Sequence, residues 1–360
     1  MKIRTIIHNK VYTALLAAAL ALLVMAPVYA ELPVPCGACA GGVWVSNGSA
    51  SLNSINNGIQ VQQQTPQAIL NWESFNVGAG KRVDFKQPSS TAVALNRIFQ
   101  GDPSRIFGSV TANGQVYLIN QNGIVFGEGA RVNTQSLIAS TLDVPDDVFS
   151  DIGLINAVNQ NRAALEGAGT NERIEVAKGA EIRVAADGRA ILAAPEVINE
   201  GTIVANEGQA ILVGATDKVY LEASDNADLR GLLVEVETGG SVTNLGEVIA
   251  DGGNATLLGF AVNQNGRVRA NSTVSKNGTI RLLARDDAVT EAGVTASVRT
   301  AVARRSGQLT IGAGSETLIA ADTSDGATAS DAQSLVATKN ENLADDILIE
   351  SGARVVAEVG

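Results

Sequence analysis

The chain has few of the residues that most often hold metals, carry out catalysis or fill a conventional core. Its 360 residues include one histidine, two cysteines and only 4% aromatic residues. A zinc site needs about four ligands, mostly Cys and His, and this sequence cannot supply them. The low aromatic content also argues against a propeller, whose blades carry periodic aromatic motifs.

The N-terminus has the pattern of an export signal. Lys2, Arg4 and Lys10 form a basic region, residues 11–24 are apolar, and residues 28–30 end the segment with Val-Tyr-Ala. The apolar run is short for a membrane span, so we expect cleavage after Ala30 rather than an uncleaved anchor. No cysteine lies at the cleavage position, which argues against a lipoprotein. The only histidine, His8, leaves with the signal.

Basic residues are also in the minority. The net charge is −11, and removal of the three basic residues of the signal makes it −14. A chain this acidic, with no basic block, is not expected to bind nucleic acid. We interpret the acidity as a means of keeping a long, repetitive β-surface soluble.

Cys36 and Cys39 lie in the stretch PCGACAGG. After an export signal, such a pair favours a small disulfide-closed loop, because exported chains reach an oxidising compartment. A thioredoxin-like redox motif is the alternative, and it would suit a cytosolic chain.

From residue 41 onward the sequence consists of short β-branched or apolar runs separated by Gly, Asn, Asp and Ser. Alternation is visible where Val116 and Leu118 fall on one face and Tyr117 and Ile119 on the other. The exception is residues 146–167, which we expect to form a short helix or an excursion from the β-framework.

The second half repeats itself. Residues 197–214 align without a gap to residues 242–259, an offset of 45, and weaker matches recur at steps of 20. This spacing predicts a solenoid with one repeat per coil, two strand-sized pieces per repeat and a superperiod near twice 20. A parallel β-helix explains the self-similarity better than a β-sandwich or a propeller does.

Two features of the repeat bear on its interior. The small residues Ala205 and Ala250 occupy matched positions and suit a narrow core. Asn199 and Asn244 also match. They could stack and hydrogen-bond between coils, or they could be ordinary solvated turn residues, and the sequence leaves both possibilities open.

Residues 118–129 read LINQNGIVFGEG, in which Asn-Gly between apolar runs signals a tight turn. With its surroundings, from about residue 41 to 144, this stretch resembles the N-terminal secretion domain of the filamentous haemagglutinin family. The family's most recognisable element is Asn-Pro-Asn-Gly-Ile. Asn120, Asn122, Gly123 and Ile124 match it, whereas Gln121 replaces the proline. The family's second element, an Asn-Pro-Asn-Leu turn, has no counterpart that we can locate.

The resemblance implies an all-β fold, a right-handed parallel β-helix with an N-terminal secretion and capping domain. We expect that domain at residues 31–170 and β-helix repeats at residues 171–360, which would continue in a longer product. Within the domain, Asn120, Asn122, Gly123 and Ile124 would form a buried, fold-defining turn.

The resemblance also implies a route of export. Members of the family are exoproteins of Gram-negative two-partner secretion systems, each recognised by a dedicated outer-membrane β-barrel transporter. The implied product is secreted or held at the cell surface, where it would act as an adhesin on a receptor or glycan of a host or neighbouring cell.

An extracellular polysaccharide-degrading enzyme is the alternative, because parallel β-helices also carry such activities. The acidic groups that could serve it are Asp217, Glu222, Asp225, Asp228 and the run Arg285-Asp286-Asp287. We expect these to lie in loops as solvated charges, since no acid recurs at matched positions on successive coils. The sequence therefore predicts no catalytic residue, no cofactor and no metal site.

Overall fold

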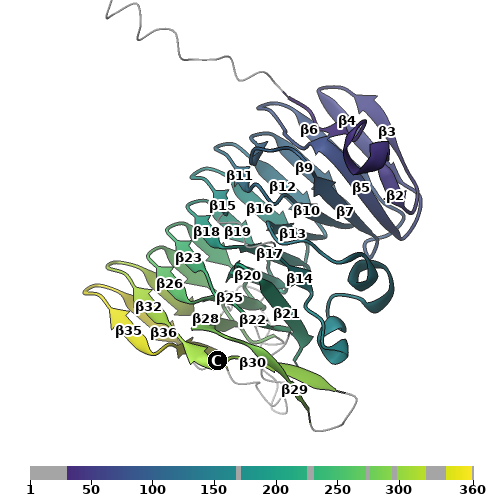
Figure 1. Ribbon diagram of the computed structural model, residues 1–360. Helices are drawn as coiled ribbons and strands as arrows, with labels where there is room; N and C mark the ends of the chain where they lie inside the picture. Colours follow the sequence, from purple (N-terminus) through teal and green to yellow (C-terminus); the bar gives the residue numbers. More distant parts are fainter. Residues whose placement is uncertain are drawn as a thin grey trace, which may run out of the picture.

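The structure, a computed structural model, describes residues 31–167, 172–224, 231–272, 276–293, 298–321 and 338–358. The predicted export signal, residues 1–30, lies outside these ranges, as do Asp225 and Asp228. The described chain winds into a parallel β-helix (Figure 1), which confirms the predicted all-β solenoid.

Three long sheets run the length of the solenoid, which we name sheets A, B and C. In the described residues, sheet A contains β1 (Val34–Pro35), β2 (Val45–Asn47), β5 (Gln67–Ser74), β7 (Val93–Ile98), β10 (Gln115–Ile119), β13 (Ser136–Ser140), β17 (Arg189–Ala194), β20 (Gln209–Gly214), β25 (Asn254–Gly259), β28 (Thr279–Asp286), β31 (Arg305–Ser306) and β34 (Lys339–Leu343). Sheet B contains β3 (Ala50–Ile55), β4 (Gly58–Gln63), β6 (Arg82–Lys86), β9 (Ser109–Ala112), β12 (Arg131–Thr134), β16 (Glu181–Val184), β19 (Thr202–Val204), β24 (Glu247–Ile249), β27 (Arg267–Arg269), β33 (Glu316–Ile319) and β36 (Arg354–Ala357). Sheet C contains β8 (Ser104–Ile106), β11 (Ile124–Phe126), β15 (Arg173–Val176), β18 (Glu196–Asn199), β23 (Ser241–Asn244), β26 (Ala261–Gln264), β32 (Gln308–Ile311) and β35 (Asp346–Ile349).

From β7 onward each rung contributes one strand to each sheet, so the prediction of two strand-sized pieces per repeat is wrong. Strands β17, β18 and β19 make one such rung, and β20 then pairs with β17 so that Arg189 lies opposite Gln209. Strands of sheets B and C are as short as three residues. Strands of that length do not stand out from turns in the sequence.

The predicted superperiod is also wrong. Val197 pairs directly with Val242, so the 45-residue offset is a single rung. That rung is longer because it carries an inserted antiparallel pair, β21 (Lys218–Ala223) and β22 (Leu232–Val236).

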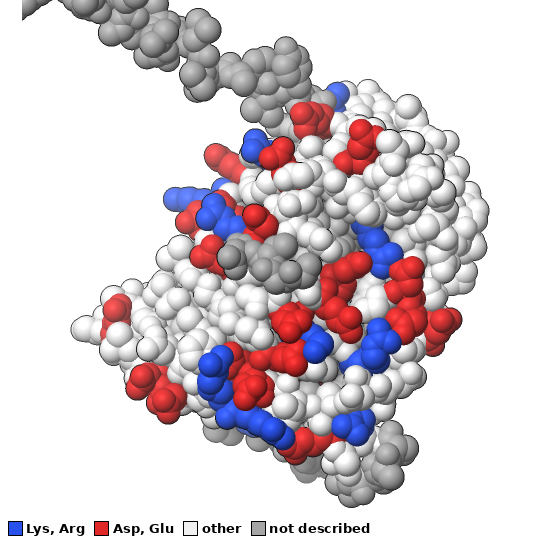
Figure 2. Space-filling model, viewed as in Figure 1, with Lys and Arg blue, Asp and Glu red and all other residues white. Residues whose placement is uncertain are grey.

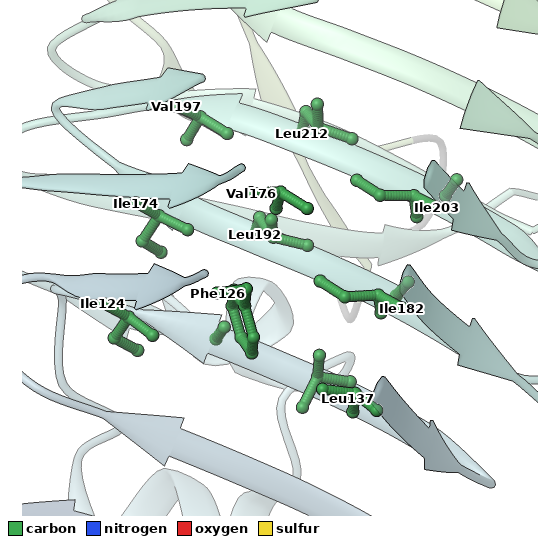
Figure 3. Packing of buried hydrophobic residues seen from close by; sticks show 14 of the residues in the cluster. Ile124, Phe126, Leu137, Ile174, Val176, Ile182, Leu192, Val197, Ile203 and Leu212 are labelled. Carbon is green, nitrogen blue, oxygen red and sulfur yellow. The ribbon is translucent and has the colours of Figure 1, made fainter. Parts of the chain in front are cut away.

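The core is the interior of the solenoid, where side chains of the three sheets stack rung upon rung. Figure 3 shows one section of it, formed by the fully or almost fully buried residues Ile124, Phe126, Leu137, Ile174, Val176, Ile182, Leu192, Val197, Ile203 and Leu212. Val116 and Leu118 point into this interior, whereas Tyr117 and Ile119 belong to a second cluster outside sheet A, as the alternation predicted. Burial of each Val, Leu or Ile contributes about 1.5–3 kcal/mol.

An antiparallel cap closes the N-terminal end. β3 and β4 form a hairpin whose turn contains Asn57 at a φ of 57°, and β1 and β2 pair antiparallel with β5. A short 3-10 segment, η1 (Cys39–Gly42), lies beside them. Trp44 and Trp72, the only tryptophans of the chain, pack edge to face here with ring centroids 5.7 Å apart.

Two additions, the excursion and the β21–β22 hairpin, cover the outer face of sheet A, and a third, the hairpin of β29 (Val289–Ala292) and β30 (Arg299–Val302), lies beside them. The predicted excursion at residues 146–167 contains a π-helical turn, η2 (Val148–Ile152), a 3-10 turn, η3 (Ala157–Gln160), and β14 (Leu165–Glu166). β14 pairs with β21 of the inserted hairpin, and β29 pairs with β30. Among the described residues, no helix has the length and apolar character needed to cross a membrane.

Candidate functional site at the Asn120–Ile124 corner

The stretch that carries the family resemblance forms a corner of the solenoid. β10 lies in sheet A and β11 in sheet C, so the turn between them joins two sheets and is not a hairpin. The backbone N–H of Gly123 donates to the carbonyl of Asn120 at 3.0 Å, which closes a four-residue turn. Gln121, the residue in place of the family's proline, is exposed in this turn.

Asn120 is the buried centre of the corner, with no exposed surface. Its Nδ2 donates to Ser104 Oγ at 2.9 Å and to the carbonyl of Asp102 at 3.2 Å, on the preceding rung. Its Oδ1 accepts the backbone N–H of Asn122 at 2.9 Å. The side-chain amide of Asn120 therefore makes hydrogen bonds to polar groups of two rungs. A buried polar group needs such partners to offset the loss of water.

Asn122 extends the same network. Its Nδ2 donates to the carbonyl of Gln100 at 2.8 Å. The side chain of Gln100 in turn donates to the carbonyls of Asp102 and Pro103, both at 2.9 Å, and accepts the backbone N–H of Phe75. The two asparagines thus fix the shape of the loop that leads into β8.

Gly123 and Ile124 finish the corner. Gly123 has a φ of +100°, and a Cβ built on it would lie 2.9 Å from the carbonyl of Arg173 on the next rung, so only glycine fits without strain. Ile124 is fully buried in the core and pairs with Ser104 on one side and Ile174 on the other. The structure brings all four motif residues together. Whether they act as a secretion motif stays a prediction.

Sequence reasoning missed two polar groups of the preceding rung. Gln100 links the corner to the loop at Phe75, whereas Asn96 lies in sheet A with no exposed surface and accepts the indole N–H of Trp72 at 2.9 Å. Asn96 precedes Asn120 by roughly one rung, and this spacing was the one signal that could have found it.

Further along, Asn199 and Asn244 form the ladder that the sequence left as one of two possibilities. Asn199 Nδ2 donates to Asn244 Oδ1 at 2.8 Å, and Asn244 Nδ2 donates to Gln264 Oε1 at 2.7 Å. All three side chains are fully buried at one corner of successive rungs. The alternative of solvated turn residues is wrong.

The surface of the N-terminal end differs from the rest. Residues 32–72 contain no Asp, Glu, Lys or Arg, although 18% of the residues in the whole chain are charged. Figure 2 shows this as the uncharged region over the cap strands β2–β5, with charges gathered over the later rungs. The cap surface is therefore neutral and polar, rich in Ser, Asn and Gln.

The candidate catalytic acids do not form a site. Glu222 lies in β21 and accepts from Thr300 at 2.7 Å, and Asp286 lies buried in β28, paired with Arg305 at 2.5 Å. Arg285 pairs with Glu235. The expectation that these groups are solvated loop charges is wrong for all three. Each lies in a strand of the hairpin or of sheet A, is partly or fully buried, and is paired with another side chain.

Asp217 lies just before β21, where burial and the neighbouring Glu237 raise the pKa of its carboxyl. No group of three or more His, Cys, Asp or Glu side chains is placed to hold a metal ion in the described ranges. Cys36 and Cys39 are joined, with sulfurs 2.09 Å apart, at the start of the cap.

Comparison with known proteins decides the family. A family model for the TPS (two-partner secretion) secretion domain matches residues 41–297, well over half of the chain. The chain belongs to this family. The matched region runs through the cap, the Asn120–Ile124 corner and the inserted hairpin, and so crosses the predicted domain boundary at residue 170, which stays a prediction.

The relatives of this TPS secretion domain are longer proteins. A heme/hemopexin-binding protein of Haemophilus influenzae strain ATCC 51907 is 36% identical over 180 residues, which are 50% of this chain and 18% of that protein. A second Haemophilus influenzae protein of that name is 44% identical over 84 residues, 23% of this chain and 9% of its own length. The chain thus spans less than a fifth of the length of these relatives.

A solved structure confirms the fold. The HMW1 secretion domain from Haemophilus influenzae superposes with a TM-score of 0.62 and 24% identity, covering 88% of this chain and 83% of that one. By its family match at residues 41–297, the chain contains the secretion domain of a two-partner secretion exoprotein, and such a domain implies a dedicated outer-membrane transporter as its partner.

Proposed function

We propose that this chain directs export of an adhesin-like exoprotein, and that its transporter recognises the N-terminal cap and the Asn120–Ile124 corner. The match of residues 41–297 to the TPS secretion domain carries the proposal. The neutral surface of residues 32–72 supports it, because no other stretch of the printed sequence is as long without a charged residue.

The topology supports the same route. From β4 onward each rung pairs in parallel with the rung before it, so strands far apart in sequence rarely meet. A solenoid of such contacts can nucleate at the cap and grow one rung at a time as the chain leaves a pore. The polar Asn120 network then gives the first rungs a defined register.

The experiment compares the native host with and without its transporter, and follows the chain in medium, cell surface and periplasm. Loss of the transporter should trap or degrade the chain in the periplasm. Arrival at the surface without the transporter would overturn the proposal. Glycan-cleavage assays, which test the alternative of a polysaccharide-degrading enzyme, would then be the next experiment. Removal of residues 1–30 serves as the control that blocks the earlier, inner-membrane step.

The adhesin role is tested separately, by attachment of the host bacterium to target cells with the gene intact or deleted. A haem-related role is a second candidate, because two relatives are named heme/hemopexin-binding proteins. Capture of haem or hemopexin by the full exoprotein, with attachment unchanged by the deletion, would favour that candidate over the adhesin.

A further inference from the structure

A cavity of about 270 Å³ lies on the outer face of sheet A, away from the Asn120–Ile124 corner. Its floor is the outward face of β10, β13 and β17, at Tyr117, Ile138 and Ile191. Its roof comes from the excursion, at Phe149 and Ile155, and the inserted hairpin β21–β22 closes one side. Both additions are absent from the solenoid framework itself, and the cavity exists because they leave a space between them.

The roof is fixed to the floor on one side of this space. The rings of Tyr117 and Phe149 lie edge to face with centroids 6.3 Å apart. Gln67 Nε2 donates to the carbonyl of Phe149 at 3.1 Å. The cavity is therefore built into a packed region rather than opened by a loosely held loop.

One wall of the cavity is a polar row. Gln115 pairs with Ser136, and Ser136 Oγ accepts the backbone N–H of Arg189 at 3.0 Å, so the three lie side by side on neighbouring strands. Among the residues that the structure describes, Arg189 is the only charged one that lines the cavity. Its Nε is buried and has no hydrogen-bond partner in the described part of the chain.

Two acids that line a neighbouring pocket together with Arg189 form ion pairs with another cation. Asp187 and Glu207 form ion pairs with Lys276 at 3.2 and 2.6 Å. A buried N–H without an acceptor is costly, because burial removes the water that would otherwise hydrogen-bond to it. The half-buried Arg189 side chain thus has one N–H left to donate to an anionic acceptor at the cavity.

The Tyr117 hydroxyl adds a neutral donor beside it. Burial raises the pKa of Tyr117 to about 12, so the phenol stays protonated at any ordinary pH. Its one hydrogen bond among the described residues, to Gln115 Oε1, is long at 3.5 Å.

We propose that this cavity binds a small amphipathic carboxylic acid, with its apolar body against Ile138, Ile191 and Phe149 and its carboxylate on Arg189. The cavity volume of about 270 Å³ is just below the usual range for small-molecule sites, about 300–1,000 Å³, which suits one ring with a short acid chain. This ligand site is independent of export and would function in the folded, secreted chain.

The experiment is calorimetric titration of the purified mature chain with 4-phenylbutyrate and with its uncharged match, 4-phenylbutanol. We expect saturable binding of the acid at one site and weaker binding of the alcohol. Arg189→Gln should weaken acid binding about tenfold or more, the loss of one charge-assisted hydrogen bond, and change alcohol binding less than about twofold. Arg183→Gln is the matched control, because Arg183 lies on β16 with half its side chain exposed and pairs with Glu181.

Filling the cavity gives an independent readout. Ile155→Trp, in the half-buried roof, and Ile138→Phe, in the floor, should each abolish binding of both compounds, with circular dichroism confirming that the β-fold persists. The proposal is overturned if neither compound binds saturably, if Arg189→Gln binds the acid as the wild type does, or if either folded filling variant retains binding.

Discussion

Asn120 Nδ2 donates to Ser104 Oγ across 2.9 Å, and this bond joins the corner of one rung to the first strand of sheet C on the rung before it. Ser104 is itself buried and pairs with Ile124, so the polar bond lies directly beside the apolar core. The hydrogen bond between this amide and this hydroxyl thus fixes the register of one rung against the next.

Removal of the Asn120 side-chain amide should destabilise the fold strongly. Asn120→Ala leaves Ser104 Oγ and the Asn122 N–H without their partner in a buried site, at a cost of about 2–4 kcal/mol. Urea unfolding of the purified chain measures this. Asn122→Ala should cost less, since it loses one bond at the rim, and the exposed Gln121→Ala should change stability negligibly. Equal effects of all three would contradict this view of the corner.

Restoring the family's proline should stabilise the chain. Gln121 is the second residue of the turn closed by Gly123 and Asn120, and no hydrogen bond from its own N–H is present in the described structure. Proline suits this position and reduces the freedom of the unfolded chain, so Gln121→Pro should gain about 0.4–1 kcal/mol. A lower unfolding midpoint for this variant would mean that the turn has a different backbone requirement.

The amide ladder makes a separate prediction in the later rungs. Asn244→Leu removes the acceptor of Asn199 and the donor to Gln264 while adding an apolar group of similar size. Two buried amides lose their partners, at an expected cost of about 2–4 kcal/mol in thermal or urea unfolding. Thr243→Ala, on the same strand but pointing outward and partly exposed, is the control and should cost far less.

Glu235 should give stability a dependence on pH. Burial raises the pKa of its carboxyl to about 7, against the opposing effect of Arg285 and Arg281, while Glu341 raises it further. The folded state then binds more protons than the unfolded state between pH 4.5 and 7, so this group's contribution is full below 4.5 and lost as pH rises through 7.

The check is urea unfolding from pH 4.5 to 8 for the wild type and Glu235→Gln. The wild type should lose more free energy of unfolding over this range than the variant. If the two curves of unfolding free energy against pH run parallel, the pKa of Glu235 is not raised in the folded state. Below this range, other carboxyls also affect stability. Arg305 and the Gly239 N–H hold the pKa of Asp286 low against the effect of burial, so protonation of this carboxyl should destabilise both proteins.

Much of the fold could be predicted from the sequence because the repeat of a solenoid appears in the chain as similar residues at a regular spacing. Matched residues such as Asn199 and Asn244 indicated that successive rungs pair in parallel, and the alternation of side chains predicted the inward and outward faces of β10. The number of strands in a rung could not be predicted correctly. The three-residue strand β19 resembles a turn, and the inserted β21–β22 hairpin lengthened one rung into an apparent double period.

The site was only partly predictable, for a different reason. Asn120 to Ile124 are contiguous, so their motif is visible in the sequence. Their partners Ser104 and Gln100 lie on the preceding rung and are joined to them only by the coiling of the chain. Arg189 and Tyr117 meet at the outer cavity in the same way, because sheet A brings β10 and β17 within two strands of each other.

The most direct test of the central claim is export of this chain in a bacterium that has no transporter of its class. The chain is produced with or without its dedicated outer-membrane transporter, and the fraction in the medium and at the surface is measured. The assignment as a secretion domain predicts release only when the transporter is present. Equal release in both strains, or retention in the periplasm despite a functional transporter, would contradict it.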